Sequence, residues 1–419
     1  MAKPRGDMAR AGALRLLDGV RQGLALSDQG DALARLVPGD QARAARLAAE
    51  TLRHQARADR VLDPLLSRRP APAVLDLLRL GTVEMLELGA PPHGVVGAAV
   101  DLARGMGRGG QAAAGMVNAV LRRVSTTGDW AGMGPQRLPD WLRAPLLAAH
   151  GRDVVRAIEV AHQAGAPLDL TPRPGADPDI EGAIALPTGS WRVPGPVQVS
   201  ALPGYAEGAW WVQDAAAALP ARLLNPRPSE RIADLCAAPG GKTLQLAAAG
   251  AEVTAVDISA ARLRRVADNL RRCGQQATLV ASDVLDWRPA ASLDAVLLDA
   301  PCSATGTIRR HPDLPFLRDG SGIAALAALQ GQLLDHALTL LRPGGRLVYA
   351  VCSLLPAEGE DQLAAVLARH PGLTVEAPSL PGIARDWITP AGGLRLRPDL
   401  WPDRGGMDGF FMVRLRVPV

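Results

Sequence analysis

The sequence predicts an α/β fold, a doubly wound and mostly parallel sheet, preceded by an all-helical region. Three observations lead to this prediction. Residues 9–124 carry apolar residues at helical spacing without strand-like alternation. From residue 231 onward, short apolar strands alternate with helical segments. The stretch Arg231–Thr243 (RIADLCAAPGGKT) joins a strand to a helix through a loop of small residues, as a nucleotide-type α/β domain begins.

Length and composition bound the class of protein. A chain of 419 residues is too long for one ordinary core and predicts two or three domains. Its 48% hydrophobic content and mean hydropathy of +0.07 are typical of a globular protein. The four cysteines and seven histidines show no disulfide framework and no metal-ligand spacing. No signal peptide or membrane-length apolar run is visible, so we expect a cytoplasmic protein, most simply a monomer, without a metal or membrane partner.

Positive charge is concentrated in the N-terminal part of the chain. Residues 1–128 hold 18 Lys and Arg against 12 Asp and Glu, whereas the remainder holds 28 against 30. This excess favours a polyanion-facing domain, and an ordinary solvated helical surface explains it equally well.

The elements follow in order along the chain. Proline and glycine breaks separate the N-terminal helical segments and predict an all-α bundle: 42–55, 62–67, 74–88 and 94–105. Residues 129–213 are mixed, with a helix that starts at Pro139–Leu142 and short strands at 168–170, 191–193 and 197–199. Parallel strands are then expected at 232–235, 253–256, 278–281, 295–298 and 346–351. Residues 410–415 are expected to form a terminal edge strand.

Reactive side chains follow the expected strands. Parallel strands direct their carboxyl ends to one edge of the sheet, where ligands bind in this fold class. The residues that fall at or just past such ends are Asp257, Asp283, Asp299, Cys302 and Cys352. The glycine loop itself is not a Walker loop, because Cys236 stands where the first glycine is needed, and it lacks G-x-G-x-x-G. A plain tight turn between strand and helix remains the alternative.

Four motifs together resemble the Sun/Fmu (RsmB) family of RNA (cytosine-5) methyltransferases, over nearly the whole chain. They are Asp234–Thr243 (DLCAAPGGKT), Asp299–Gly306 (DAPCSATG), Arg309–Asp313 (RRHPD) and Tyr349–Ser353 (YAVCS). Segments 78–86 and 117–123 resemble the NusB-like RNA-binding domain that precedes the methyltransferase in this family. One departure is Val351, where the family usually has a threonine, so a supporting hydroxyl is lost.

The resemblance implies a domain plan and an activity. It implies an all-α NusB-like RNA-binding domain over 1–128, a small mixed subdomain over 129–213, and a Rossmann-like S-adenosylmethionine-dependent methyltransferase domain over 214–419. The implied reaction transfers a methyl group to C5 of a cytosine in RNA, most naturally 16S ribosomal RNA, through a covalent cysteine–C6 adduct.

The resemblance also assigns the cofactor contacts. Backbone contacts to the methionine part fall to Cys236, Ala237, Ala238, Pro239, Gly240, Gly241 and Lys242. Asp257 would accept from ribose hydroxyls, Asp283 would meet the adenine amino group, and Asp299 would contact both cofactor and base. A helix N-cap is the alternative for Asp257 and a turn is the alternative for Asp283.

The cysteines carry the chemistry that the resemblance implies. C5 of cytosine is a poor nucleophile until a thiolate adds to C6, and a base must later remove the C5 proton. Cys352 is implied as the nucleophile and Cys302 as the group that assists breakdown of the adduct. Asp299 contacts the base edge, and Lys242 contacts base or phosphate and favours a thiolate by its charge. A buried hydrophobic role is the alternative for a lone cysteine.

Seven basic residues are candidates for RNA contact: Arg309, Arg310, His311, Arg122, Arg123, Arg68 and Arg69. A structural loop explains the first three almost as well, and an ordinary surface explains the other four. Two other function classes stay open. One is an RNA-binding or antitermination module without catalysis. The other is a DNA cytosine methyltransferase, in which the Pro-Cys cysteine, Cys302, would be the nucleophile and Cys352 dispensable.

Overall fold

The computed structural model describes residues 5–195 and 197–419, which divide into two compact units. We call residues 5–144, 152–164 and 308–319 the helical unit. We call residues 145–151, 165–307 and 320–419, apart from 196, the sheet unit. The helical unit therefore contains two later segments of the chain, 152–164 and 308–319, in addition to its N-terminal part. No helix among the described residues is long and apolar enough to cross a membrane.

The N-terminal part of the helical unit consists of helices, as the sequence predicted, except that the segment predicted at 62–67 is mainly a 3-10 turn at Asp63–Leu65. They are α1 (Arg5–Arg21), α2 (Gly30–Leu33), α3 (Pro38–Arg53), α4 (Gln55–Leu62), α5 (Pro72–Leu86), α6 (Pro92–Gly105) and α7 (Gly107–Val124), with short 3-10 turns at Leu26–Asp28 and Asp63–Leu65. Three of these helices begin at a proline, a residue that suits the first helical position because its missing N–H has no partner there. Helix α5 is buried along most of its length and joins the apolar clusters of the unit.

Helix α8 (Asp140–Ala164) follows and is interrupted at Gly151, which has φ of 79°. After it, a small antiparallel sheet has the order β2-β3-β1-β4. Its strands are β1 (Leu168–Pro172), β2 (Ile184–Ala185), β3 (Trp191–Val193) and β4 (Trp210–Val212). A buried ion pair crosses from β1 to β3, where Arg192 Nε lies 2.7 Å from Asp169 Oδ1. The strands predicted at 168–170 and 191–193 are confirmed, whereas the strand predicted at 197–199 is wrong, because a 3-10 turn begins at Val199.

The main sheet has eight strands, seven of them in the order β10-β12-β9-β8-β5-β6-β7, with β11 paired to β12. They are β5 (Arg231–Leu235), β6 (Glu252–Asp257), β7 (Thr278–Ala281), β8 (Leu293–Asp299), β9 (Leu341–Val351), β10 (Thr374–Glu376), β11 (Leu394–Leu396) and β12 (Phe410–Arg416). Strands β5 to β9 pair in parallel. The mostly parallel sheet that the sequence predicted is therefore confirmed.

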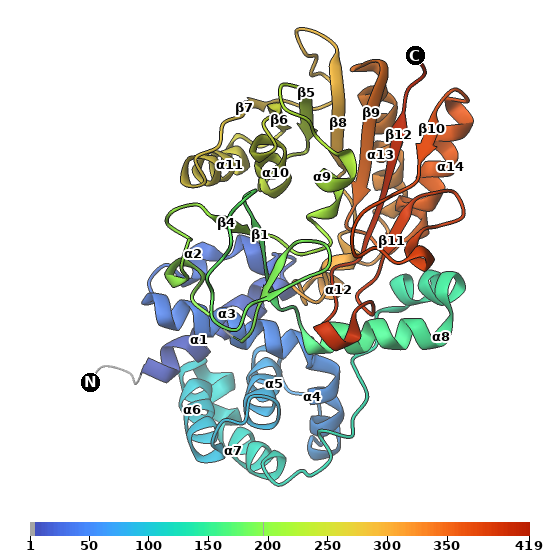
Figure 1. The fold of residues 1–419 in the computed structure, drawn as a ribbon. Helices are drawn as coiled ribbons and strands as arrows, with labels where there is room; N and C mark the ends of the chain where they lie inside the picture. Colours follow the sequence, from blue (N-terminus) through green and yellow to red (C-terminus); the bar gives the residue numbers. More distant parts are fainter. Residues whose placement is uncertain (1–4, 196) are drawn as a thin grey trace. The chain divides into compact units, whose positions relative to one another are not determined.

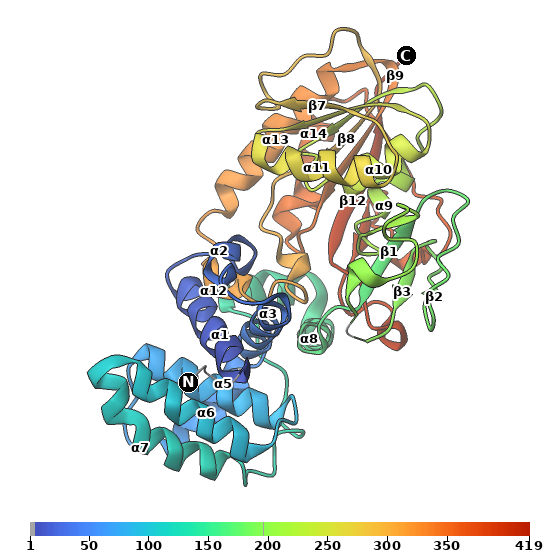
Figure 2. The same ribbon diagram turned by 90° about the vertical axis from the view of Figure 1, so that its left-hand side faces the viewer.

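Helices cover both faces of this sheet, as Figures 1 and 2 show. Helices α9 (Leu219–Leu224), α10 (Gly241–Ala248) and α11 (Ala260–Arg272) lie on one face, and α13 (Ile323–Thr339) and α14 (Glu360–Arg369) lie on the other. The α13 and α14 face packs against buried residues of β8, β9 and β12. A short helix, α12 (Leu314–Leu317), belongs to the helical unit.

The edge position predicted for residues 410–415 is wrong. Strand β12 lies inside the sheet, antiparallel to β9 on one side and to β10 and β11 on the other. Its residues Phe410–Val413 are all buried, because both edges of the strand are paired and both faces are covered. An uninterrupted apolar run is typical of such a central strand.

Strand order determines where a ligand can bind. Strands β5, β6 and β7 run outward in one direction from the middle of the sheet, and β8 and β9 run in the other. The order therefore reverses between β5 and β8. In open parallel sheets the crevice beyond the carboxyl ends at such a reversal is the usual ligand site.

Candidate functional site

The loop after β5 forms one wall of this crevice. Within it, Ala237 N–H donates to Val256 of β6 at 3.1 Å and Gly240 N–H donates back to Ala237 at 2.9 Å. Gly240 has φ of 102°, and a Cβ there would lie 3.0 Å from Val266 Cγ1 of α11. Glycine is thus required both by the backbone conformation and by the close approach of the helix. The conformation of this loop is therefore fixed by its hydrogen bonds to β6 and by its packing against α11.

Asp257, the last residue of β6, secures this loop. Its Oδ2 accepts from Ala238 N–H at 3.1 Å, its Oδ1 accepts from Ser259 N–H at 2.9 Å, and the residue is 1% exposed. Asp283 follows β7 and is exposed, with Oδ1 accepting from Leu285 N–H at 2.9 Å. Both acids therefore stand where the sequence placed them, at successive strand ends. Each also makes a local backbone contact.

Asp234 is a further acid that the sequence analysis did not assign to the site. It lies in β5, is fully buried, and accepts from Thr243 Oγ1 at 2.6 Å. Burial raises the pKa of Asp234 to about 7, against the opposing effects of the Thr243 hydrogen bond and the Lys242 charge. Asp234 opens the motif Asp234–Thr243, and that position is the signal that could have pointed to it.

Lys242 and Asp299 form an ion pair across the crevice between β5 and β8. Lys242 Nζ lies 2.6 Å from Asp299 Oδ2 and 5.6 Å from the centre of the Phe410 ring. Burial by itself lowers the pKa of Lys242, but the charge of Asp299 and its hydrogen bond raise it by more, and the charges of Asp234 and Cys352 add to the rise. Lys242 therefore stays protonated and places a positive charge beside Asp299 and Cys352.

The two cysteines of the motifs meet at the carboxyl ends of β8 and β9. These strands are neighbours, with Asp299 opposite Ala350, as the sequence led us to expect. Cys302 Sγ lies 3.4 Å from Cys352 Sγ, and both residues are partly exposed. Gly306 N–H donates to Cys352 O at 2.9 Å and joins the two loops through the backbone. Two thiols at this distance can act on one substrate ring.

The surroundings of the cysteines set their protonation. The hydrogen bond with Cys352, burial, and the charges of Cys352 and Glu358 raise the pKa of Cys302 well above its usual value. Burial and three nearby acids raise the pKa of Cys236 to about 12. Cys302 and Cys236 are therefore thiols at neutral pH.

Val351 directly precedes Cys352 and is fully buried in the core of the sheet unit. It pairs with Phe411 of β12. A threonine hydroxyl at this position would need a buried partner, and valine removes that need.

Arg309 is buried, which favours the structural-loop alternative over the predicted RNA contact. The segment 308–319 belongs to the helical unit, where Arg309 is 1% exposed and its carbonyl accepts from Arg53 Nη1 at 2.8 Å. Arg310 is partly buried and His311 is exposed. Of the three predicted residues, His311 is therefore the most accessible.

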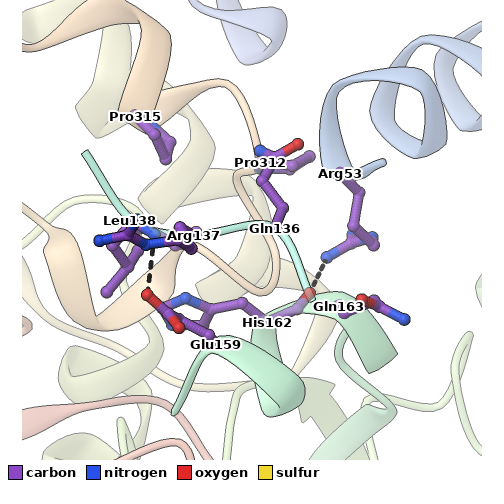
Figure 3. A pocket seen from close by; sticks show the side chains of 10 residues that line it. Arg53, Gln136, Arg137, Leu138, Glu159, His162, Gln163, Pro312 and Pro315 are labelled. Atoms are coloured by element: carbon purple, nitrogen blue, oxygen red, sulfur yellow. Dashed lines mark hydrogen bonds between the residues drawn. The ribbon is translucent and has the colours of Figure 1, made fainter. Parts of the chain in front are cut away.

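A small cavity of about 30 Å³ lies beside this segment, within the helical unit. Figure 3 shows Arg53, His162, Glu159 and Pro312 around it. Burial, reinforced by the charges of Arg53 and Arg309, lowers the pKa of His162 to about 3. The ring is therefore neutral at physiological pH.

Arg122 and Arg123 lie in the last turn of α7, and both are exposed. Arg122 Nε donates to Asn118 Oδ1 at 3.2 Å. The structure thus leaves both guanidinium groups accessible to an anionic partner.

Comparisons with known proteins agree with this arrangement. Residues 221–416 match the family described as 16S rRNA methyltransferase RsmB/F, and residues 7–126 match the NusB family. The chain is 37% identical over 368 residues to the ribosomal RNA small subunit methyltransferase B of Salmonella typhi, covering 81% of each chain.

Solved structures resemble the fold. The crystal structure of PH0851 has a TM-score of 0.71 at 22% identity and covers 99% of each chain. A methyltransferase homolog protein from Pyrococcus horikoshii has a TM-score of 0.52 at 26% identity, covering 67% of this chain and 99% of its own. These similarities support the sheet architecture described above.

Proposed function

Because the chain belongs to the RsmB/F family of methyltransferases, we propose that it transfers a methyl group to C5 of a cytosine in small-subunit ribosomal RNA. The observation that carries this proposal is the pair of thiols, Cys302 and Cys352, 3.4 Å apart beside the Lys242–Asp299 ion pair. A protein that only binds RNA has no need of two such cysteines. The cytoplasm, where ribosomal subunits are made, is the expected location.

The residues around the loop fit S-adenosylmethionine as the methyl donor. The loop 236–242 leads into the N-terminus of α10, where backbone N–H groups can meet an anionic group, and the acids at the end of β6 and after β7 can accept from nucleoside hydroxyl and amino groups. Asp257 Oδ1 accepts one backbone N–H and has a second lone pair for a ribose hydroxyl, whereas Oδ2 accepts Ala238 N–H and lies 3.5 Å from Arg262 Nη2. We assign the adenine amino group to Asp283 and the remaining loop contacts to Cys236–Lys242.

The chain's own residues would carry the reaction in two stages. When bound, S-adenosylmethionine supplies an electrophilic methyl group. The Cys352 thiolate donates its electron pair to C6, which makes C5 nucleophilic while Asp299 contacts the base edge. Once C5 carries the methyl group, a base removes the C5 proton, the C5–C6 double bond forms again, and Cys352 leaves with its electron pair. We assign assistance in this second stage to Cys302.

The proposal predicts methyl transfer to small-subunit ribosomal RNA. Incubation with methyl-labelled S-adenosylmethionine should label this RNA, and nuclease digestion should place the label in 5-methylcytosine. Mapping of 5-methylcytosine in ribosomal RNA from cells with and without the protein should then locate the base. RNA binding without label would indicate a binding module, and label in DNA alone would indicate the DNA enzyme class.

The helical unit is expected to add RNA affinity through Arg122 and Arg123. Replacing both by alanine should weaken RNA binding and reduce the slope of log affinity against log salt by about 1 to 2, since each phosphate contact contributes roughly 0.7–0.9. Filter binding across a salt series measures this slope. The matched control is the exposed pair Arg264 and Arg265 of α11, which carries the same charge. Equal losses from both pairs would show that net charge alone is responsible.

A further inference from the structure

Glu358 is a fully buried carboxylate that contacts both cysteine loops of the sheet unit. Its Oε1 accepts from Ser303 N–H at 2.9 Å and from Gln330 Nε2 at 3.0 Å. Its Oε2 accepts from Ser303 Oγ and from Ser353 Oγ, both at 2.5 Å. Ser303 directly follows Cys302, and Ser353 directly follows Cys352. One side chain therefore ties together the residues next to both thiols.

The hydrogen-bonding capacity of this carboxylate is used completely. A carboxylate offers about four lone-pair positions and no hydrogen. Four donors fill these positions, two of them from Ser303. Thr305 Oγ1 extends the network, because it accepts from Leu354 N–H at 3.0 Å and lies 3.3 Å from Ser353 Oγ. The loops after β8 and β9 are therefore joined by side chains as well as by the strand ladder.

A purely structural role explains this arrangement poorly. Burying a charge is costly, and an apolar side chain of similar volume is often at least as stabilising. A carboxylate is favoured here because it alone accepts from both serines, a backbone N–H and an amide at once. Its charge also lies close enough to Cys302 to contribute to the raised pKa of that thiol.

We propose that Glu358 is a positioning residue of the methyl-transfer site, which holds the Cys302 and Cys352 loops in the register that lets both thiols act on one base. The inference rests on the proposed function. It adds that the relative position of the two thiols is set by a third residue that touches neither substrate nor cofactor.

Two substitutions separate the effect of the four hydrogen bonds of Glu358 from the effect of its charge. Glu358→Ala removes all four hydrogen bonds. Glu358→Gln keeps an acceptor for Ser303 N–H and Gln330 and can donate to the serine hydroxyls, but it removes the charge. Glu376→Ala is the matched control, because Glu376 Oε1 lies 2.6 Å from Arg416 Nε in the same unit and contacts neither cysteine loop.

Glu358→Ala should lower kcat by about 100-fold, a loss that a displacement near 1 Å of the reacting groups can cause, with little change in KM for S-adenosylmethionine. Glu376→Ala should leave kcat unchanged. The double variant Cys302→Ala/Glu358→Ala should form the covalent RNA complex more slowly than Cys302→Ala alone, by about the same factor of 100. An unchanged kcat and an unchanged rate of complex formation would overturn the positioning role.

Glu358→Gln provides the second test, which remains usable if the alanine variant does not fold. Because glutamine keeps partners for Ser303, Gln330 and Ser353, this variant should retain kcat within a few-fold of the unsubstituted protein. A loss as large as the 100-fold expected for Glu358→Ala would contradict positioning by these hydrogen bonds. If the unsubstituted protein itself forms no methylated product, the proposed function fails instead, so the two failures are distinguishable.

Discussion

Replacing the proposed nucleophile, Cys352→Ala, should abolish methyl transfer and leave no covalent complex between protein and RNA. Without Sγ no bond to C6 can form, and C5 stays a poor nucleophile toward the methyl group. The expected loss is on the order of 10⁴-fold or more in kcat, as for removal of other covalent nucleophiles. Label transfer to ribosomal RNA measures the activity, and a denaturing gel detects the complex.

Two controls separate loss of chemistry from loss of fold. Cys352→Ser keeps nearly the same volume and should be equally inactive, because a serine hydroxyl is a far weaker nucleophile at neutral pH. Cys273→Ala changes a buried cysteine that follows α11 and belongs to none of the four motifs, and it should retain methyl transfer. Substantial activity in Cys352→Ala would remove the basis for the proposed mechanism.

Cys302→Ala should still attack the base but release it slowly, so a denaturation-resistant protein–RNA band should accumulate in the presence of S-adenosylmethionine. Cys302 lies 3.4 Å from the nucleophile and is a thiol at neutral pH, so its proposed part comes after attack. The band should be strong compared with the unsubstituted protein, whose complex turns over. Loss of the band after adding Cys352→Ala to the same chain identifies Cys352 as the attacking residue.

The reverse pattern has a specific meaning. A band from Cys352→Ala and none from Cys302→Ala would make Cys302 the nucleophile, as in the DNA enzyme class.

Val351 affects the expected rate at which the covalent protein–RNA complex forms. A threonine hydroxyl is missing beside Cys352, and we expect the band of Cys302→Ala to form slowly for that reason. Val351→Thr in the Cys302→Ala background tests this directly.

Much of the sheet unit was predictable because its signals are local. The alternation of short apolar strands with helices predicted the parallel sheet, and strands β8 and β9 are neighbours as expected. The end of each strand is visible in the sequence as the change from apolar residues to Asp257, Asp299 or Cys352. Parallel strands bring such ends to one edge, so the candidate site could be assembled without coordinates.

Predictions based on motif adjacency alone were less successful. Arg309 stands seven residues after Cys302, yet the chain leaves the sheet unit there and buries Arg309 in the helical unit. Residues 410–415 come last in the chain, yet β12 lies inside the sheet. Position along the chain carries little information about which partners a segment acquires, because those partners come from distant parts of the sequence.

The sequence by itself determined the fold class, the loop after β5 and the two cysteines with their candidate roles, because each depends on residues close together in the chain. The tertiary structure alone decided that Lys242 pairs with Asp299 and that Asp234 is fully buried. It also decided that Glu358 joins the two cysteine loops, through a hydrogen bond to Ser303 that spans 55 residues of sequence. Burial and long-range hydrogen bonds form only when the strands assemble, so no local pattern specifies them.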